Sequence, residues 1–594
     1  MCGIAGAVWT AEGEPITSAT LAAMTNSLAH RGPDAEGMYW SPATSEGDLG
    51  PRAALGHRRL SIIDVAGGQQ PLSNEDGTVW IVFNGEIYNY RELQAELTSR
   101  GHRLQTSTDT ECIVHLYEEL GPACVDRLRG MFAFALWDER RRRLLLARDR
   151  LGKKPLVYRC ESDRLFFGSE LKALLQVPGV PREIDPQAVD EYLTYQYVPH
   201  PHSILKGFAK LPPAHVAIWE NGRLTVKRYW HPPYEDAPAG QKNEAATRTP
   251  DEWRAALRET LTEAVRLRLR SDVPLGAFLS GGIDSTIIAG LMQQLSDRPI
   301  KTFSIGFPVK AFDERSYARE AAQRIGSEHH EAVVEPHALE MLPKLIWHYD
   351  EPFADSSAIP TMYLSRMTRE HVTVALSGDG GDELFAGYQR YGAVQLAGYI
   401  DRLPNWVRRG LSAPLWQKLP ASVEQKSRRR QFKRLLSALG EPPELRYLQW
   451  VSIFDAARRR SLYSAEFAES LGNTDSADFL RAAYRECACR DFTTRTTCAD
   501  VLTYLPCDIL TKVDIASMAY GLECRSPFLD QEVVELAAQM PMPLKRRRFR
   551  GKRILLEAFG HLLPESIQKR SKMGFGVPLD HWFRGELRPM LEGV

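Results

Sequence analysis

Cys2 stands directly after the initiator methionine, where it could act as a nucleophile. A small residue in this position permits removal of the methionine, which would leave a thiol and a free α-amino group on one residue. An α-amine has a reference pKa of about 7.7–8.0 and is a suitable base near neutral pH, while the thiol supplies the attacking atom. A lone cysteine is nevertheless more often structural, so this prediction depends on the residues that accompany it.

A glycine-rich loop at residues 279–286, LSGGIDST, joins an apolar strand to an apolar helix. Glycines let a backbone approach phosphate closely, and the first turn of the following helix offers unpaired N–H groups. Ser280 and Ser285 add hydroxyl donors, whereas the carboxylate of Asp284 suits Mg²⁺ rather than phosphate. The loop matches neither a Walker loop nor a dinucleotide-binding fingerprint. With two glycines alone, an ordinary strand-to-helix connection would be the better interpretation.

A second loop at residues 377–383, SGDGGDE, also follows an apolar strand. In an open parallel sheet, both loops would lie at the carboxyl edge, which is where ligands bind. Asp284 and Asp382 would then supply two carboxylates to one Mg²⁺–pyrophosphate. The pair of loops therefore predicts a nucleotide site.

The sheets that carry these residues differ between the two halves of the chain. In the first half, short apolar runs such as 79–89 and 130–138 lie between turn signals, which predicts an α+β arrangement of antiparallel sheets with helices outside. In the second half, the strands 276–280, 300–307 and 371–378 alternate with helical stretches. This alternation predicts a parallel α/β sheet, followed by a helical C-terminal part.

A linker is predicted at residues 231–250, which are rich in proline, alanine and glycine and show no periodicity. Thr249 would cap the helix that follows, with a proline at the first helical position and Glu252 in the capping-box position. We therefore expect one domain at residues 1–230 and a second at residues 251–594.

The overall composition narrows the class of protein. Lys+Arg and Asp+Glu both number 75, so no net charge favours binding to nucleic acid or to an anionic membrane. The cysteines form no C-x-x-C pair, which predicts reduced thiols rather than a cysteine zinc site or a disulfide framework. The sequence shows neither a secretory signal nor an apolar run of about eighteen residues, so the expected location is the cytoplasm, without a membrane span.

Three further segments accompany the N-terminal Cys-Gly-Ile: residues 30–34 (HRGPD), 59–64 (RLSIID) and 84–89 (NGEIYN). This set resembles the class II glutamine amidotransferase domain, and the resemblance covers residues 1 to about 230. It implies an N-terminal-nucleophile fold, which is a four-layer α-β-β-α sandwich, and it implies hydrolysis of glutamine.

The resemblance also implies the residues that act on the carboxamide. Cys2 resembles the nucleophile, and Asn84 with the backbone N–H of Gly85 resembles the oxyanion hole, whose donors must face the oxygen of the tetrahedral intermediate. Asn-Gly between apolar runs is also a strong hairpin signal, so a simple turn is the alternative interpretation.

Three charged residues are implied to hold the amino-acid end of glutamine. Arg59 would bind the α-carboxylate, because a planar guanidinium suits that group. Asp109, helped by the region of Glu86, would pair with the substrate ammonium. A surface ion pair between Arg59 and Asp109 is the alternative interpretation.

The nucleotide loop at residues 279–286 resembles that of the N-type ATP pyrophosphatases, which adenylate a substrate and release pyrophosphate. A class II glutaminase followed by such a domain resembles asparagine synthetase (glutamine-hydrolysing), and residues 508–514 (DILTKVD), 523–530 (ECRSPFLD) and 551–555 (GKRIL) extend this resemblance. It implies that ATP and Mg²⁺ activate aspartate as β-aspartyl-AMP. It also implies that ammonia from glutamine crosses an apolar passage and displaces AMP, and that the chain is a homodimer.

Further residues are assigned through the same resemblance. Lys552 resembles the lysine that offsets negative charge during adenylation. Asp379 falls where the family carries an acidic residue important for forming or consuming the intermediate. Mg²⁺ would be held by Asp284 and Asp382. The implied ATP-binding residues are Leu279, Ser280, Gly281, Gly282, Asp284, Ser285, Ile305, Ser377 and Gly378.

Two segments depart from the family pattern and leave the acceptor open. Well-known asparagine synthetases read SGEGSDE where this chain reads SGDGGDE, so Asp379 is one methylene shorter than the usual glutamate. Residues 350–360 (DEPFADSSAIP) also differ from the aspartate-site segment of those enzymes, and His348 and Tyr349 beside them could line the acceptor site.

Three alternative functions follow from these departures. The first is the same amidotransferase chemistry on another carboxylate, such as a cell-envelope sugar acid, a peptide or a secondary-metabolite precursor. The second is a β-lactam-synthetase-like cyclase, against which the intact Cys2 counts. The third is a non-catalytic storage or scaffold protein, for which damaged motifs would be expected.

Overall fold

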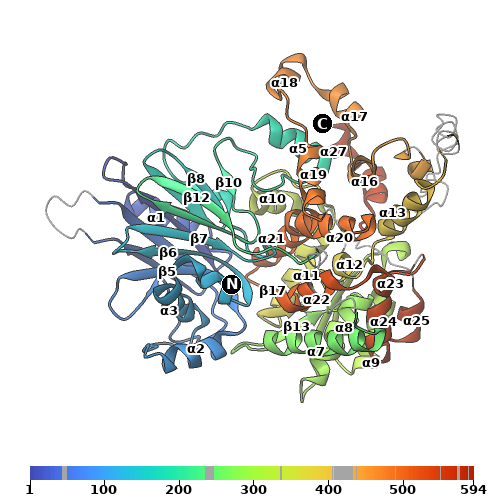
Figure 1. Cartoon of the computed structure of the whole chain (residues 1–594), viewed down its shortest axis with the longest axis horizontal. Helices are drawn as coiled ribbons and strands as arrows, with labels where there is room; N and C mark the ends of the chain where they lie inside the picture. The colour runs from blue at the N-terminus through green and yellow to red at the C-terminus, as the bar shows by residue number, and fades with distance from the viewer. Residues whose placement is uncertain are drawn as a thin grey trace.

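A computed structural model gives the fold of the chain (Figure 1). It describes residues 1–594 apart from 43–49, 235–246, 335–337, 405, 407–432, 437, 488–489, 549, 571–575, 586 and 594. Most of the predicted linker at 231–250 therefore lies outside the described residues. In Figure 1 the first half of the chain, in blue to green, lies beside the second half, in yellow-green to red.

The first half contains two six-stranded antiparallel sheets, with strand orders β10-β8-β9-β1-β3-β2 and β12-β11-β7-β6-β5-β4. The strands are β1 (Gly3–Trp9), β2 (Ala35–Trp40), β3 (Arg52–Arg59), β4 (Leu72–Ser73), β5 (Val79–Ile87), β6 (Gly130–Asp138), β7 (Arg143–Arg148), β8 (Val157–Cys160), β9 (Arg164–Gly168), β10 (Ala209–Lys210), β11 (His215–Glu220) and β12 (Arg223–Arg228). The helices are α1 (Ser18–Asn26), α2 (Tyr90–Ser99), α3 (Asp109–Leu120), η1 (Gly121–Arg127), α4 (Leu171–Leu174) and α5 (Pro186–Tyr195).

Successive side chains of the central strands point to opposite faces and pack into the cores between these layers. On β1, Val8 belongs to the core between the two sheets, whereas Ala7 faces the core beneath α1 and α4. On β6, Ala135 faces the core between the sheets, whereas Phe134 packs with residues of α2 and α3. Because successive strand residues point to opposite faces, both sheets are buried on both sides. The predicted four-layer α-β-β-α sandwich is confirmed.

The second half contains a five-stranded sheet of order β15-β14-β13-β16-β17, and every neighbouring pair is parallel, as the sequence predicts. Apolar cores with helical residues cover both of its faces. Its elements up to the second loop are α7 (Pro250–Arg268), β13 (Leu275–Phe278), α8 (Ile283–Gln294), β14 (Lys301–Gly306), η2 (Lys310–Phe312), α9 (Arg315–Ile325), β15 (Glu328–Val333), α10 (Ala338–Tyr349), α11 (Ala358–Arg369), β16 (Val374–Leu376) and α12 (Gly381–Leu384).

The remainder of the described chain is mostly helical, as predicted, and supplies the edge strand β17 (Glu523–Arg525). The helical elements are α13 (Gln389–Ile400), α16 (Pro443–Val451), α17 (Ala456–Leu462), α18 (Ala465–Ser470), α19 (Ala477–Arg485), α20 (Phe492–Leu502), η4 (Leu505–Leu510), α21 (Thr511–Met518), η5 (Pro527–Leu529), α22 (Gln531–Gln539), α23 (Met542–Lys545), α24 (Arg553–Phe559), η6 (Gly560–Leu562), α25 (Glu565–Lys569), α26 (Leu579–Arg584) and α27 (Arg588–Glu592). The predicted capping box of α7 is present, with Thr249 and Glu252 bonding each other's backbone N–H. Among the described residues, every helix is too short or too polar to cross a membrane.

Candidate active sites

Cys2 lies at the start of β1, inside the first half of the molecule, and is only 7% exposed. Its backbone N–H donates a 3.0 Å hydrogen bond to Oδ1 of Asn84 on β5, and its carbonyl accepts a 3.1 Å bond from Nε of Arg31. Two elements that are distant in sequence therefore fix the backbone on both sides of the thiol.

Asn84 and Gly85 lie within β5 and form part of a strand, not the hairpin turn that was the alternative interpretation. Since Oδ1 of Asn84 accepts from Cys2, the amide Nδ2 points elsewhere, and this buried donor has no hydrogen-bond partner. The N–H groups of Phe83 and Ile87 are bonded to side chains on the edge of β5 away from β6. Because alternate N–H groups of a strand face the same edge, the N–H of Gly85 points to this edge too.

The pKa of the Cys2 thiol reflects opposing influences. Burial is the largest and raises the pKa above its ordinary value, while the α-ammonium of Met1, a hydrogen bond from the backbone of Leu60 and the charge of Arg59 lower it. Met1 is 1% exposed, and its ammonium lies 3.3 Å from a carboxylate oxygen of Glu523. Removal of Met1 would make Cys2 the first residue, so that the free α-amine would belong to Cys2 itself.

Arg59 is buried at the end of β3, where its guanidinium donates to the carbonyl oxygens of residues 63–65 at 2.6–3.3 Å. It does not form the surface ion pair with Asp109 that was the alternative interpretation, because both side chains are buried and Arg59 bonds backbone oxygens instead. These bonds fix the guanidinium, and its positive charge lowers the pKa of the Cys2 thiol.

Asp109 and Glu86 form a buried acidic pair near Cys2. Asp109 opens α3 and accepts a 2.8 Å bond from the N–H of Ile87, whereas Glu86 lies 3.1 Å from a guanidinium nitrogen of Arg525. Burial is the main influence on both groups, raising the pKa of Asp109 to about 6 and the pKa of Glu86 well above its ordinary value. The charge of Asp109 raises the pKa of Glu86 further, and the charge of Arg525 opposes the rise at both carboxyl groups. Arg525 pairs with Glu86 and also with Glu523, so the two buried carboxyl groups of Asp109 and Glu86 would gain from a further cation.

The nucleotide residues predicted from the two loops line one cavity of about 510 Å³, which is within the usual range for small-molecule sites. Neighbouring strands β13 and β16 end at its floor, which brings the loops together. Gly281 has φ +66° and packs against the backbone of α9, where an added Cβ would come within 2.5 Å of Tyr317. The predicted residues on the wall are Leu279, Ser280, Gly281, Gly282, Asp284, Ser285, Ile305, Ser377, Gly378, Asp379, Asp382 and Lys552.

Lys552 connects the two predicted metal carboxylates, since its ammonium contacts both Asp284 and Asp382, the latter at 2.6 Å. One small cation therefore already reaches both carboxylates. Oxygen ligands of this kind suit Mg²⁺, so the donor set fits the predicted ion.

Asp379 lines the same cavity. Its carboxylate accepts a 2.7 Å hydrogen bond from Ser377, and Ser377 is 2.9 Å from the hydroxyl of Ser526. Lys153, from the first half of the chain, donates to Ser526. The loop of Asp379 is thus tied to both halves of the molecule.

The predicted acceptor segment divides between two cavities. Asp355 and Ser357 line the nucleotide cavity, where Asp355 pairs at 2.5 Å with the ammonium of Lys512. His348 and Tyr349 instead line a different cavity between the two halves, so their suggested place in the acceptor site stays a prediction. Lys512 was not singled out from the sequence, although it belongs to the quoted segment 508–514.

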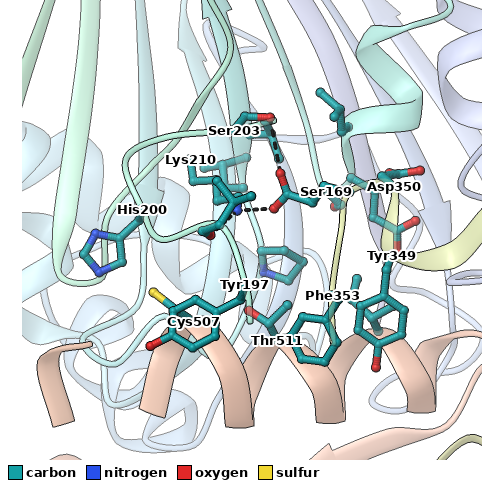
Figure 2. Close-up of a pocket in the computed structure, with 18 of the residues that line it drawn as sticks. Ser169, Tyr197, His200, Ser203, Lys210, Tyr349, Asp350, Phe353, Cys507 and Thr511 are labelled. Carbon is teal, nitrogen blue, oxygen red and sulfur yellow. Dashed lines mark hydrogen bonds and ion pairs between the residues drawn. The ribbon is translucent and has the colours of Figure 1, made fainter. Parts of the chain in front are cut away.

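This second cavity measures about 80 Å³ and is lined by residues of both halves (Figure 2). Tyr197 and His200 come from the first half, whereas Cys507 and Thr511 come from the helical segment at the bottom of Figure 2. Lys210 and Ser203 contact the same carboxylate, that of Glu351. Burial is the main reason that the pKa of His200 is lowered to about 3, so this imidazole is neutral at pH 7.

The two halves are also joined by buried charges. Arg31, whose Nε bonds Cys2, donates through Nη2 to Asp514 at 2.8 Å. Lys154 donates to the other oxygen of Asp514 at 2.9 Å. The sequence quoted both Arg31 and Asp514 within motifs, but nothing in it paired residues so far apart.

Comparison with known proteins follows the same division. Residues 1–230 match the glutamine amidotransferase domain model, and residues 256–594 match the asparagine synthase model. The chain is 34% identical to "Asparagine synthetase [glutamine-hydrolyzing] 1" of Bacillus subtilis, covering 100% of this chain and 90% of that protein. The chain belongs to the asparagine synthase family. A putative glutamine-hydrolysing asparagine synthetase of Mycobacterium bovis is 37% identical to this family member over 99% of the chain and 89% of the relative.

A more distant relative of this asparagine synthase family member has a different name. The Gibberella zeae protein "Amidase chry2" is 28% identical, covering 94% of this chain and 85% of the relative. The family scaffold therefore occurs in proteins that are not named as asparagine synthetases.

Proposed function

We propose that the chain makes asparagine from aspartate, ATP and glutamine, with the glutaminase in residues 1–230 and the synthetase in residues 251–594. The observation that carries this proposal is the presence of two complete sites in one chain. Asn84 accepts from the N–H of Cys2 and keeps a buried amide donor without a hydrogen-bond partner. Both glycine loops and Lys552 line one cavity. The names of the two relatives at 34% and 37% identity support the same chemistry.

Glutamine hydrolysis begins when the thiolate of Cys2 attacks the side-chain carbonyl carbon. Nδ2 of Asn84 and the N–H of Gly85 donate to the oxygen that becomes negative. The α-amine of Cys2 takes the proton of the thiol and passes it to the leaving nitrogen, which departs as ammonia. Water then cleaves the thioester and releases glutamate. Arg59 binds the α-carboxylate of glutamine, and Asp109 with Glu86 supplies the negative charge that pairs with its ammonium.

In the synthetase half, an oxygen of the aspartate side-chain carboxylate attacks the α-phosphorus of ATP, and pyrophosphate leaves. Lys552 offsets the negative charge of the phosphates, and Asp284 and Asp382 would hold Mg²⁺. When bound, that ion would neutralise part of the pyrophosphate charge. Ammonia then attacks the acyl carbon of β-aspartyl-AMP, and AMP leaves.

The cavity between the halves is proposed as part of the route for ammonia. Glu170 lines it and pairs at 2.7 Å with Arg31, whose Nε bonds the carbonyl of Cys2, so the cavity lies close to the nucleophile. The cavity is also lined by Thr511, which precedes in sequence the Lys512 of the nucleotide cavity. Burial is likewise the main reason that the pKa of His348 is lowered to about 3, so this lining imidazole would not protonate the ammonia.

The decisive experiment incubates the protein with ATP, Mg²⁺ and glutamine, with and without aspartate, and measures asparagine, glutamate, AMP and pyrophosphate together. We expect asparagine, AMP and pyrophosphate only with aspartate. Cys2→Ala should lower glutamine-dependent synthesis by at least about 10³-fold, because no nucleophile remains, and should leave synthesis from added ammonium unchanged. Glutamate formation without aspartate-dependent pyrophosphate release would exclude aspartate and point to another carboxylate acceptor.

Glutamine binding should weaken at acidic pH because of Asp109. The pKa of Asp109 is raised to about 6 by burial, and only its charged form can pair with the ammonium of glutamine. Below that pH the charged fraction falls about tenfold per unit, so kcat/KM for glutaminase should fall likewise, while kcat at saturating glutamine changes less. The measurement is kcat/KM for glutamate release between pH 4.5 and 8, in steps of roughly half a pH unit.

Asp109→Asn serves as the control for this acid limb. The variant should have a lower kcat/KM at pH 7, and its acid limb should move away from pH 6, because Asp109 no longer titrates and only Glu86 of the pair remains. An acid limb of unchanged position in Asp109→Asn would show that another group controls binding.

A further inference from the structure

A cluster of metal-ligand side chains lies on the outer face of the first half, apart from both proposed catalytic sites. It consists of Glu75, His102, His115 and Glu118, called here the His–Glu cluster. Glu75 stands between β4 and β5, His102 lies between α2 and α3, and the other two occupy positions i and i+3 of α3. Three separate segments of the chain therefore meet at one point.

One ligand atom from each of the four side chains lies within 4.8 Å of all the others. His115 Nδ1 is 2.8 Å from Glu118 Oε2 and 3.7 Å from Glu75 Oε2, and His102 Nδ1 is 3.8 Å from Glu118 Oε2. A tetrahedral zinc ion with ligands at about 2.0–2.1 Å keeps those ligands about 3.3 Å apart. Small side-chain movements would bring the four atoms to these distances.

The Nε2 atoms of the two histidines face two more carboxylates, those of Glu111 and Glu119. His115 is fully buried, and its Nε2 lies 3.6 Å from Glu111, whose oxygens accept from the N–H groups of Gln105 and Thr106 at 2.7 Å. His102 Nε2 lies 3.3 Å from Glu119. Metal-bound histidines commonly direct their second ring nitrogen to a carboxylate, which fixes the ring and strengthens the ligand.

The two glutamates of the cluster are oriented in the same way. The Oε1 atom of Glu118 accepts a 2.8 Å bond from Asn74, and the Oε1 atom of Glu75 accepts a 3.0 Å bond from the backbone of Arg103. Each carboxylate therefore uses one oxygen for the surrounding protein and directs the other toward the two Nδ1 atoms.

We propose that the His–Glu cluster binds one zinc ion through two Nδ1 and two Oε2 atoms. Imidazole nitrogen combined with carboxylate oxygen in a tetrahedral set is a donor combination that zinc accepts. Four carboxylates surround the two imidazoles, and Arg100 pairs with one of them, Glu119, so the region keeps an excess of negative charge that a divalent cation would offset. The role is structural, because the described protein residues supply all four ligands and leave no open position for a substrate.

Zinc at this position would restrict the movement of the segment that leads into α3. Glu111, which faces His115, also holds the backbone of residues 105–106, and Asp109 follows directly as the first residue of the helix. The ion would thus fix the hairpin of Glu75, the segment of His102 and α3 relative to one another. This inference stands independently of the proposed reaction.

The test titrates zinc and cobalt(II) into full-length Cys2→Ala protein freed of metal by chelation. We expect one ion per chain, an apparent Kd on the order of 1 µM or lower, and a Tm raised by several degrees. Cobalt should give the visible absorption of a tetrahedral nitrogen–oxygen site, without the near-ultraviolet band of thiolate ligands. A thiolate band, six-coordinate cobalt or no stoichiometric uptake would overturn the proposal.

Variants locate the ion within the chain. His102→Ala and Glu75→Gln change partly exposed side chains, so folding should survive, and each should weaken zinc binding at least tenfold and abolish the rise in Tm. The matched control is His561→Ala, which removes an exposed histidine outside the cluster and should leave binding unchanged. Unchanged zinc affinity in folded His102→Ala would also overturn the proposal.

Discussion

Replacement of Asn84 by alanine is expected to lower the glutaminase kcat by about 10²–10³-fold, while the KM for glutamine changes little. The buried Nδ2 of Asn84 has no hydrogen-bond partner in the free protein, and its orientation is set because Oδ1 accepts from Cys2. A buried donor without a partner costs stability, so its retention is explained by an oxygen that becomes charged during the reaction. Synthesis from added ammonium should be unaffected. The measurement is steady-state glutamate release beside ammonium-dependent asparagine formation.

Two further variants separate donation from positioning. Asn84→Asp keeps an oxygen that can accept from Cys2 but loses the donor, so its kcat should fall at least as far as that of the alanine variant. Asn89 is the matched control, because both atoms of its amide already bond the backbone of the 127–129 segment. Asn89→Ala should lower stability and leave the glutaminase kcat within about threefold of wild type. A nearly normal kcat in Asn84→Asp would show that the donor is not needed.

The sequence was sufficient for features that contiguous residues determine. Residues 279–286 and 377–383 each contain their own strand end, glycines and helix start, and the parallel pairing of β13 with β16 then brings the two loops together. The alternation of apolar residues likewise predicts the sheets of the first half. Asn84-Gly85 shows the limit of local patterns, because the pair that signals a hairpin lies inside β5. There an added Cβ at Gly85 would come within 2.2 Å of Met131, so the glycine serves close strand packing.

Contacts between distant segments could not be predicted in this way. Lys552 reaches Asp284 across 268 positions, and Arg31 reaches Asp514 across 483, so no local spacing relates them. The surroundings of His348 were not predictable for a related reason. It lies near the acceptor segment in sequence, but the end of α10 places it against the first half of the molecule, where its ring contacts that of His30 at 4.7 Å.

Replacement of Asp514 by asparagine is expected to cost roughly 3–5 kcal/mol of stability. It should also uncouple glutamine hydrolysis from asparagine synthesis. Asp514 is 3% exposed and accepts from both Arg31 and Lys154. The variant would leave the buried ammonium of Lys154 with a neutral partner, whereas Arg31 would keep its ion pair with Glu170. Burial is the largest influence on its carboxyl and would raise the pKa, but the two cations outweigh it and lower the pKa. Arg31 also bonds the carbonyl of Cys2, so its displacement should disturb transfer of ammonia. We expect a fall in Tm of roughly 2–4 °C and less asparagine per glutamate released.

Two comparisons isolate the buried charge from a general loss of contacts. Lys154→Met combined with Asp514→Asn removes the cation that Asp514→Asn leaves uncompensated, so the double variant should be more stable than Asp514→Asn alone. Glu331→Gln removes a carboxylate that pairs with the exposed Arg319 and should cost no more than about 1 kcal/mol, because water screens that pair. The ratio of asparagine to glutamate distinguishes a disturbed interface from simple unfolding, since unfolding lowers both activities together. If Asp514→Asn keeps the wild-type Tm and the wild-type ratio, Arg31 and Lys154 find other partners and the buried carboxylate does not hold the two halves together.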